Sequence, residues 1–110
     1  MKLEKAVASF AALAHETRLG VFRRLVVAGP EGASASALAE ALGVGPTALS
    51  FHLSQLSAAG LVRSRRDGRW TYYSADFARM RALIDYLLED CCRGAPAAEA
   101  RRATKTKRSC

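Results

Sequence analysis

The chain has 110 residues, of which half are hydrophobic and a quarter are charged. This length allows one domain with a modest core and excludes a large multi-domain enzyme. No stretch approaches the roughly 20 apolar residues of a bilayer span, and no signal sequence opens the chain. Three cysteines, two of them adjacent, do not suit a disulfide-stapled secreted domain. We therefore expect a cytoplasmic protein without membrane contact.

Positive charge is unevenly distributed along the chain. Residues 1–92 carry eleven basic and nine acidic side chains, whereas residues 93–110 carry six basic side chains and one acidic side chain. The second segment has no sizeable apolar residue, so it cannot bury enough surface to repay its ordering entropy. We expect a folded domain over residues 1–92 and a flexible basic tail over residues 93–110.

Apolar residues at helical spacing predict two helices at the start of the chain. The first ends near Leu13, and the second begins at Glu16 and stops at Gly29-Pro30. His15 stands where a cap of the second helix is expected, which is a more natural role for it than metal ligation.

Two shorter helices follow, separated by a tight turn. Ser36 is placed to cap a helix that ends at Gly43, and Pro46 suits the first turn of a helix that extends to Ala59. Their spacing is typical of a helix-turn-helix. The apolar seam between them is expected to contain Leu38, Leu42, Leu49, Leu53 and Leu56.

A β-hairpin is predicted directly after this pair, from Leu61 to Tyr73, with Asp67-Gly68 as its turn. Arginines concentrate around the turn, which favours a polyanionic partner. A helix-turn-helix followed by a basic hairpin is the winged-helix arrangement. The predicted fold is therefore mainly α with a small β-hairpin, and the predicted partner is double-stranded DNA.

The last predicted helix begins after Asp76, which can cap it, and carries an apolar stripe as far as Cys91. Such a stripe needs a partner, and two copies can bury each other around a two-fold axis. We expect a homodimer.

Several segments together resemble the ArsR/SmtB family of winged-helix repressors, over about residues 8–92. They are Leu13 to Leu19, the helix pair, Gly60-Leu61-Val62 and Arg66 to Trp70; Ser50 to Leu53 resembles the family's Ser-x-His-Leu in the recognition helix. The resemblance implies a homodimer joined through its first and last helices. It also implies a repressor that binds an imperfect palindromic operator and releases it when a metal or metalloid binds.

On this basis we assign candidate DNA contacts. The helix from Pro46 would enter the major groove, and the hairpin would follow the phosphates. For His52, packing against the hairpin is the alternative to DNA contact. The candidates are Thr47, Ala48, Ser50, Phe51, His52 and Gln55 on the helix, and Arg65, Arg66 and Arg69 on the hairpin.

The family's sensor sites transfer only in part. Ser34-Ala35-Ser36 stands where arsenite-sensing relatives carry Cys-x-Cys, and neither histidine lies in the last helix, where the family's zinc site would need one. The chain looks like arsenic-responsive members with C-terminal thiols. The candidate ligands are therefore Cys91, Cys92 and, provisionally, Cys110, for arsenite or antimonite as inducer.

Adjacent helical side chains diverge by about 100°, so Cys91 and Cys92 can share one atom only where the helix frays. The alternatives are a thiol-redox switch or an organoarsenical sensor on the same fold, and a dimerisation module that does not bind DNA. No catalytic constellation or resident cofactor site is present in the sequence, so we do not expect an enzyme.

Overall fold

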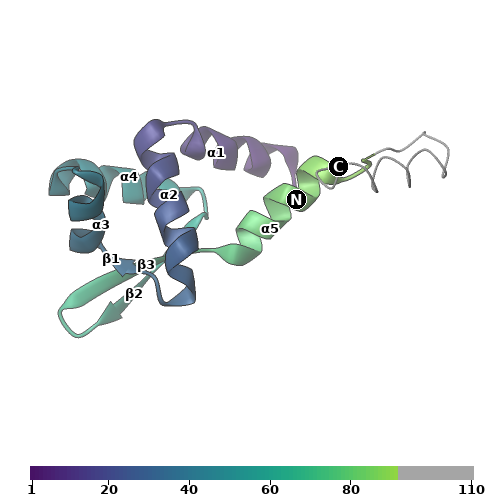
Figure 1. Cartoon of the computed structure of the whole chain (residues 1–110). Helices are drawn as coiled ribbons and strands as arrows, with labels where there is room; N and C mark the ends of the chain where they lie inside the picture. Colours follow the sequence, from purple (N-terminus) through teal and green to yellow (C-terminus); the bar gives the residue numbers. More distant parts are fainter. Residues whose placement is uncertain (92–110) are drawn as a thin grey trace.

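Five α-helices and a small antiparallel sheet form the part of the chain that the structure, a computed structural model, describes: residues 1–91 (Figure 1). The expected tail, residues 93–110, lies outside it. This architecture confirms the predicted winged helix-turn-helix. The elements are α1 (Leu3–Leu13), α2 (Glu16–Ala28), the 3-10 turn η1 (Gly29–Glu31), β1 (Ala33–Ser34), α3 (Ala35–Leu42), α4 (Pro46–Ala58), β2 (Val62–Asp67), β3 (Trp70–Ala75) and α5 (Phe77–Leu88).

Local capping chemistry sets the limits of the helix-turn-helix. The N-cap of α3 is Ser34, whose hydroxyl accepts a hydrogen bond from the Ala37 N–H, so the prediction of Ser36 as the cap is wrong by two residues. The chain turns at Gly43, which has φ +65° and ends α3 as expected. Pro46 occupies the first turn of α4, where its missing N–H group costs no hydrogen bond within the helix.

The core lies between α2, α3, α4 and the sheet. Leu38, Leu49, Leu53 and Leu56 are buried, as the predicted seam requires, whereas Leu42 is half-buried. Packing of these leucines holds α3 against α4. Each fully buried leucine contributes about 1.5–3 kcal/mol of hydrophobic stabilisation. The rest of this core cluster comprises Ala6, Val21, Phe22, Leu25, Leu61, Val62, Ala75 and Leu83.

The sheet has the strand order β1-β3-β2. Asp67 pairs with Trp70, so the hairpin loop is Gly68-Arg69, one residue later than the predicted Asp67-Gly68 turn. The sequence did not predict β1, whose two residues pair with Tyr72 and Tyr73 and are too few for an alternating pattern. From here on, the β2–β3 hairpin is called the wing.

Helices α1 and α5 contact each other and present exposed apolar side chains. Figure 1 shows α5 extending away from the sheet, past the N-terminal end of α1. Helix α5 ends at Leu88, so the prediction that its stripe continues helically to Cys91 is wrong. We call the side chains Leu3, Val7, Phe10, Ile84, Leu87 and Leu88 the apolar face of α1 and α5.

None of the helices in residues 1–91 is long and apolar enough to cross a lipid bilayer.

Candidate nucleic-acid interface

Helix α4 has one face in the core and one face in solvent. Its leucines at positions 49, 53 and 56 are buried, and Phe51 on the opposite side is 57% exposed. A bulky aromatic side chain that stays in solvent although the helix packs on a hydrophobic core can contact another molecule. The predicted contact residues Thr47, Ala48, Ser50, Phe51 and Gln55 are all exposed. Ser54, which the sequence analysis did not single out, is exposed with them.

His52 lies at the edge of this face and is half-buried. Its Nδ1 atom is 3.3 Å from Nη1 of Arg18, and its ring centroid is 4.7 Å from that of His15. These contacts join α4 to the start of α2. The expectation that His52 packs against the wing is therefore wrong, and DNA contact stays a prediction. Burial, His15 and Arg18 all lower the pKa of His52 from its usual value.

His15 caps α2, as predicted. Its Nδ1 atom accepts a hydrogen bond of 3.1 Å from the Thr17 N–H. The cap satisfies one of the free N–H groups in the first turn of the helix, and it fixes the imidazole ring beside His52. The same residue therefore begins α2 and contacts α4 through His52.

The arginines of the wing fall into two groups. Arg65 donates a hydrogen bond of 2.8 Å to the Glu31 carbonyl oxygen, pairs with Asp67 at 4.0 Å and lies 4.8 Å above the ring of Tyr72. The side chains of Arg66 and Arg69 have no hydrogen bond or ion pair to any residue in the part of the chain that the structure describes. The predicted set of three is therefore one arginine held against the body and two with unengaged guanidinium groups.

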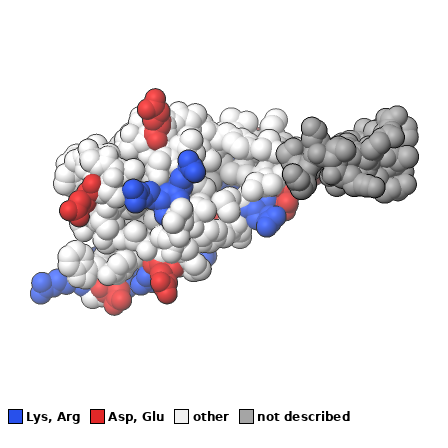
Figure 2. All heavy atoms as spheres, in the orientation of Figure 1, with Lys and Arg blue, Asp and Glu red and all other residues white. Residues whose placement is uncertain are grey.

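Basic side chains project at the outer end of the wing, with acidic side chains interspersed nearby (Figure 2).

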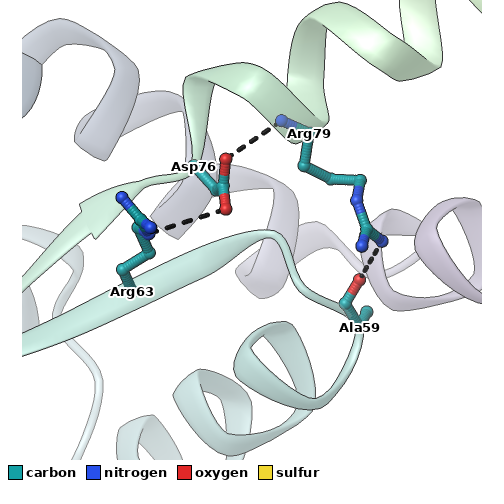
Figure 3. A network of polar contacts seen from close by, with 4 residues as sticks. All are labelled: Ala59, Arg63, Asp76 and Arg79. Atoms are coloured by element: carbon teal, nitrogen blue, oxygen red, sulfur yellow. Dashed lines mark hydrogen bonds and ion pairs between the residues drawn. The ribbon is translucent and has the colours of Figure 1, made fainter.

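A polar junction fixes the base of the wing (Figure 3). Asp76 Oδ1 accepts a hydrogen bond of 3.0 Å from the Arg79 N–H, which makes Asp76 the N-cap of α5 as predicted. Its Oδ2 atom lies 3.7 Å from Nε of Arg63 on β2. Arg79 in turn donates a hydrogen bond of 2.9 Å to the Ala59 carbonyl oxygen at the end of α4. These contacts tie α4, the wing and α5 together.

Of the candidate arsenic ligands, only Cys91 lies within the described residues, and its side chain is exposed. It follows the end of α5 by three residues, and Asp90 before it has φ +66°, which helical backbone does not adopt. Cys92 and Cys110 lie outside the described residues. Within residues 1–91, no three His, Cys, Asp or Glu side chains are grouped so that they could hold a metal ion.

Comparisons with known proteins agree with this architecture. A model of a helix-turn-helix domain family matches residues 13–65. A protein of Halobacterium salinarum that is named as an arsenical resistance operon repressor, ArsR, is 44% identical over 71 residues, which are 64% of this chain and 54% of that protein. The chain spans about half the length of the first curated relatives it matches.

Two solved structures extend the likeness. An ArsR-like transcriptional regulator from Rhodococcus sp. RHA1 has a TM-score of 0.69 and 34% identity, covering 96% of this chain and 92% of that one. A homodimeric winged helix-turn-helix DNA-binding domain from Mycobacterium bovis has a TM-score of 0.64 and 31% identity, covering 80% and 82%. These relatives are named as transcriptional regulators, which confirms the expectation that the protein is not an enzyme. The chain belongs to the ArsR/SmtB family of winged-helix transcriptional regulators.

Proposed function

We propose that the protein is a repressor that binds operator DNA as a homodimer, with α4 in the major groove and the wing along the phosphates. The observation that carries the proposal is the division of α4 into a leucine face held by the core and an exposed face of Thr47, Ser50, Phe51 and Gln55. Hydroxyl and amide groups on such a face supply donors and acceptors to base edges, and Phe51 supplies an apolar contact for a thymine methyl group.

The apolar face of α1 and α5 supports the homodimer. Leu87 is 63% exposed and Leu3 is 62% exposed, which is unfavourable for large apolar side chains in water. A second copy of the chain covers this face around a two-fold axis and places two α4 helices on one side of the dimer. Half-sites on DNA then lie about 34 Å apart, one helical turn. The homodimeric domain from M. bovis supports the same arrangement.

The proposed inducer is trivalent arsenic, with Cys91, Cys92 and Cys110 as ligands. Three thiols displace the three hydroxyl groups of arsenous acid as water, and each forms one sulfur–arsenic bond. Two observations support this choice: Cys91 is exposed where the chain has already left α5, so helical geometry does not hold its sulfur apart from a neighbour, and a relative is named as an arsenical resistance repressor.

Release would follow from the position of the thiols. Cys91 is three residues from Leu88, the last residue of α5 and a member of the apolar face. Binding of an arsenic atom by these thiols changes the end of α5. A small hinge motion in the dimer interface at the apolar face of α1 and α5 then misplaces one of the two α4 helices on the DNA. Complete reversal from 99:1 bound to 1:99 needs about 5.5 kcal/mol of preference for the released state.

Selection of duplexes from a random-sequence pool tests the DNA-binding part of the proposal. The wild-type protein should enrich one imperfect palindrome, and Gln55→Ala should weaken binding to it by about 1–3 kcal/mol or change the preferred base. Ser57→Ala, in the last turn of the same helix, is the matched control and should bind as the wild type does. Failure to enrich any sequence, or unaltered specificity of both Ser50→Ala and Gln55→Ala, would contradict the proposed role of α4.

A further inference from the structure

Arg18 joins three elements through one guanidinium group. It lies near the start of α2, and its Nε atom donates a hydrogen bond of 2.7 Å to the Ala12 carbonyl oxygen at the end of α1. Its Nη1 atom contacts Nδ1 of His52 on α4 at 3.3 Å. The carbonyl groups in the last turn of a helix lack partners within the helix, so this bond also satisfies the end of α1. Arg18 therefore links a helix of the apolar face to the recognition helix.

The contact determines which nitrogen of His52 carries the proton. A guanidinium group has only donors and stays protonated in proteins, so Nδ1 of His52 must be the acceptor. The neutral imidazole then carries its proton on Nε2. Within residues 1–91, Nε2 of His52 has no hydrogen-bond partner in the protein. His52 is thus a donor in a fixed tautomer at the edge of the exposed face of α4.

We propose that Arg18 is a positioning residue for DNA recognition: it holds His52 as the Nε2–H tautomer, so that α4 offers this N–H to an acceptor on duplex DNA. The acceptor is an oxygen or nitrogen with a free lone pair, either at a base edge in the major groove or on a phosphate. This inference rests on the proposed function, because it assumes that α4 meets DNA. It adds a residue outside the helix-turn-helix pair to the recognition machinery.

The electrostatics of the site support this reading. The titratable and charged groups that act on His52 within the described chain are His15 and Arg18, and both disfavour a second positive charge. With burial, they lower the pKa of His52, so the ring stays neutral and keeps its acceptor toward Arg18 at neutral pH. Protonation would place an N–H against the guanidinium group and break the contact.

A first experiment tests the tautomer without DNA. Imidazole ¹H–¹⁵N correlation spectra across a pH titration should show the wild-type His52 protonated at Nε2 and titrating below its ordinary pKa. Arg18→Met, which keeps the aliphatic stem and loses every donor, should give mixed tautomers and a raised pKa. Arg23→Met removes an exposed arginine from the same helix and should change neither property. An Arg18→Met spectrum with an unchanged tautomer and an unchanged midpoint would overturn the proposal.

A second experiment tests the consequence for DNA with a double-mutant cycle on the selected duplex. Arg18→Met should weaken binding about tenfold, the order expected when each of the two protomers loses one hydrogen bond of modest strength. His52→Gln keeps a terminal N–H donor that needs no tautomer, so Arg18→Met in that background should cost less than about twofold. Equal losses in both backgrounds would show that Arg18 acts through charge or folding alone, and would overturn the proposal. Thermal unfolding of all four proteins identifies any variant that fails to fold.

The two possible acceptors differ in their sequence dependence. If the Nε2–H group meets a base edge, Arg18→Met weakens the selected duplex and leaves random duplexes unaffected. If it meets a phosphate, binding to every duplex falls alike. A wild-type protein that binds no duplex would refute the proposed function and the DNA role of His52 together. Normal DNA affinity of Arg18→Met beside a binding wild type would refute the positioning role alone.

Discussion

Substituting Arg66 by alanine removes from each wing a guanidinium group that has no hydrogen bond or ion pair within residues 1–91. The substitution removes no side-chain hydrogen bond or ion pair within the described protein. Its effect on DNA affinity therefore reports the contribution of phosphate contact alone. Each phosphate neutralised contributes about 0.9 to the slope of log K against log salt. Because a dimer has two wings, Arg66→Ala should lower that slope by about 1.8.

Over a fourfold rise in salt, from about 50 to 200 mM, this difference makes the wild type lose about twelvefold more affinity than Arg66→Ala loses. Fluorescence anisotropy of a labelled duplex at four salt concentrations measures both slopes. Arg69→Ala should behave in the same way. Arg65→Ala should change the slope less, since the Glu31 carbonyl oxygen and Asp67 already engage its guanidinium group.

Arg23→Ala, an exposed position on α2, is the charge-matched control and should leave the slope unchanged. An Arg66→Ala slope equal to that of the wild type would refute a phosphate contact. A loss of affinity confined to one operator variant would point to base or groove-width recognition by the wing.

Three further predictions concern the dimer, the fold and the inducer. Leu87→Glu should convert the dimer to a folded monomer in light scattering, because the exposed side chain serves only the apolar face; a persistent dimer would place the interface elsewhere. Gly32→Ala should lower the free energy of unfolding in urea by at least about 1 kcal/mol, because Gly32 has φ +75° and the new Cβ would lie 2.0 Å from the Tyr73 carbonyl oxygen; wild-type stability would contradict this. Cys91→Ser and Cys92→Ser proteins should bind DNA and ignore arsenite; release at the wild-type arsenite concentration would locate the sensor elsewhere.

Local chemistry was sufficient to predict most of the fold. The predicted limits of α2 and α4 depend on residues within one turn of the helix end, namely His15 as a cap, Gly29 as a stop and Pro46 as a start. The cap of α3 was misplaced because two serines, Ser34 and Ser36, stand at the same helix start, and only the backbone direction distinguishes them. Strand β1 has two residues and exists because β3 pairs with it.

The candidate interface was predictable only in its outline. The helical spacing of the leucines in α4 separates its buried face from its exposed face, and this spacing is visible in the sequence. The contact between Arg18 and His52 spans 34 positions and that between Arg79 and Ala59 spans 20, so no local pattern indicates either one. The difference between Arg65 and Arg66 is likewise tertiary, because it depends on η1 passing close to the wing.

Hydroxyl-radical footprinting of the selected duplex tests the central claim, that a dimer of this chain binds DNA through two α4 helices and two wings. We predict two protected stretches related by a two-fold axis, with centres about 10 base pairs or one helical turn apart. A single asymmetric footprint, or the absence of protection at protein concentrations that saturate the shift of the duplex, would contradict it.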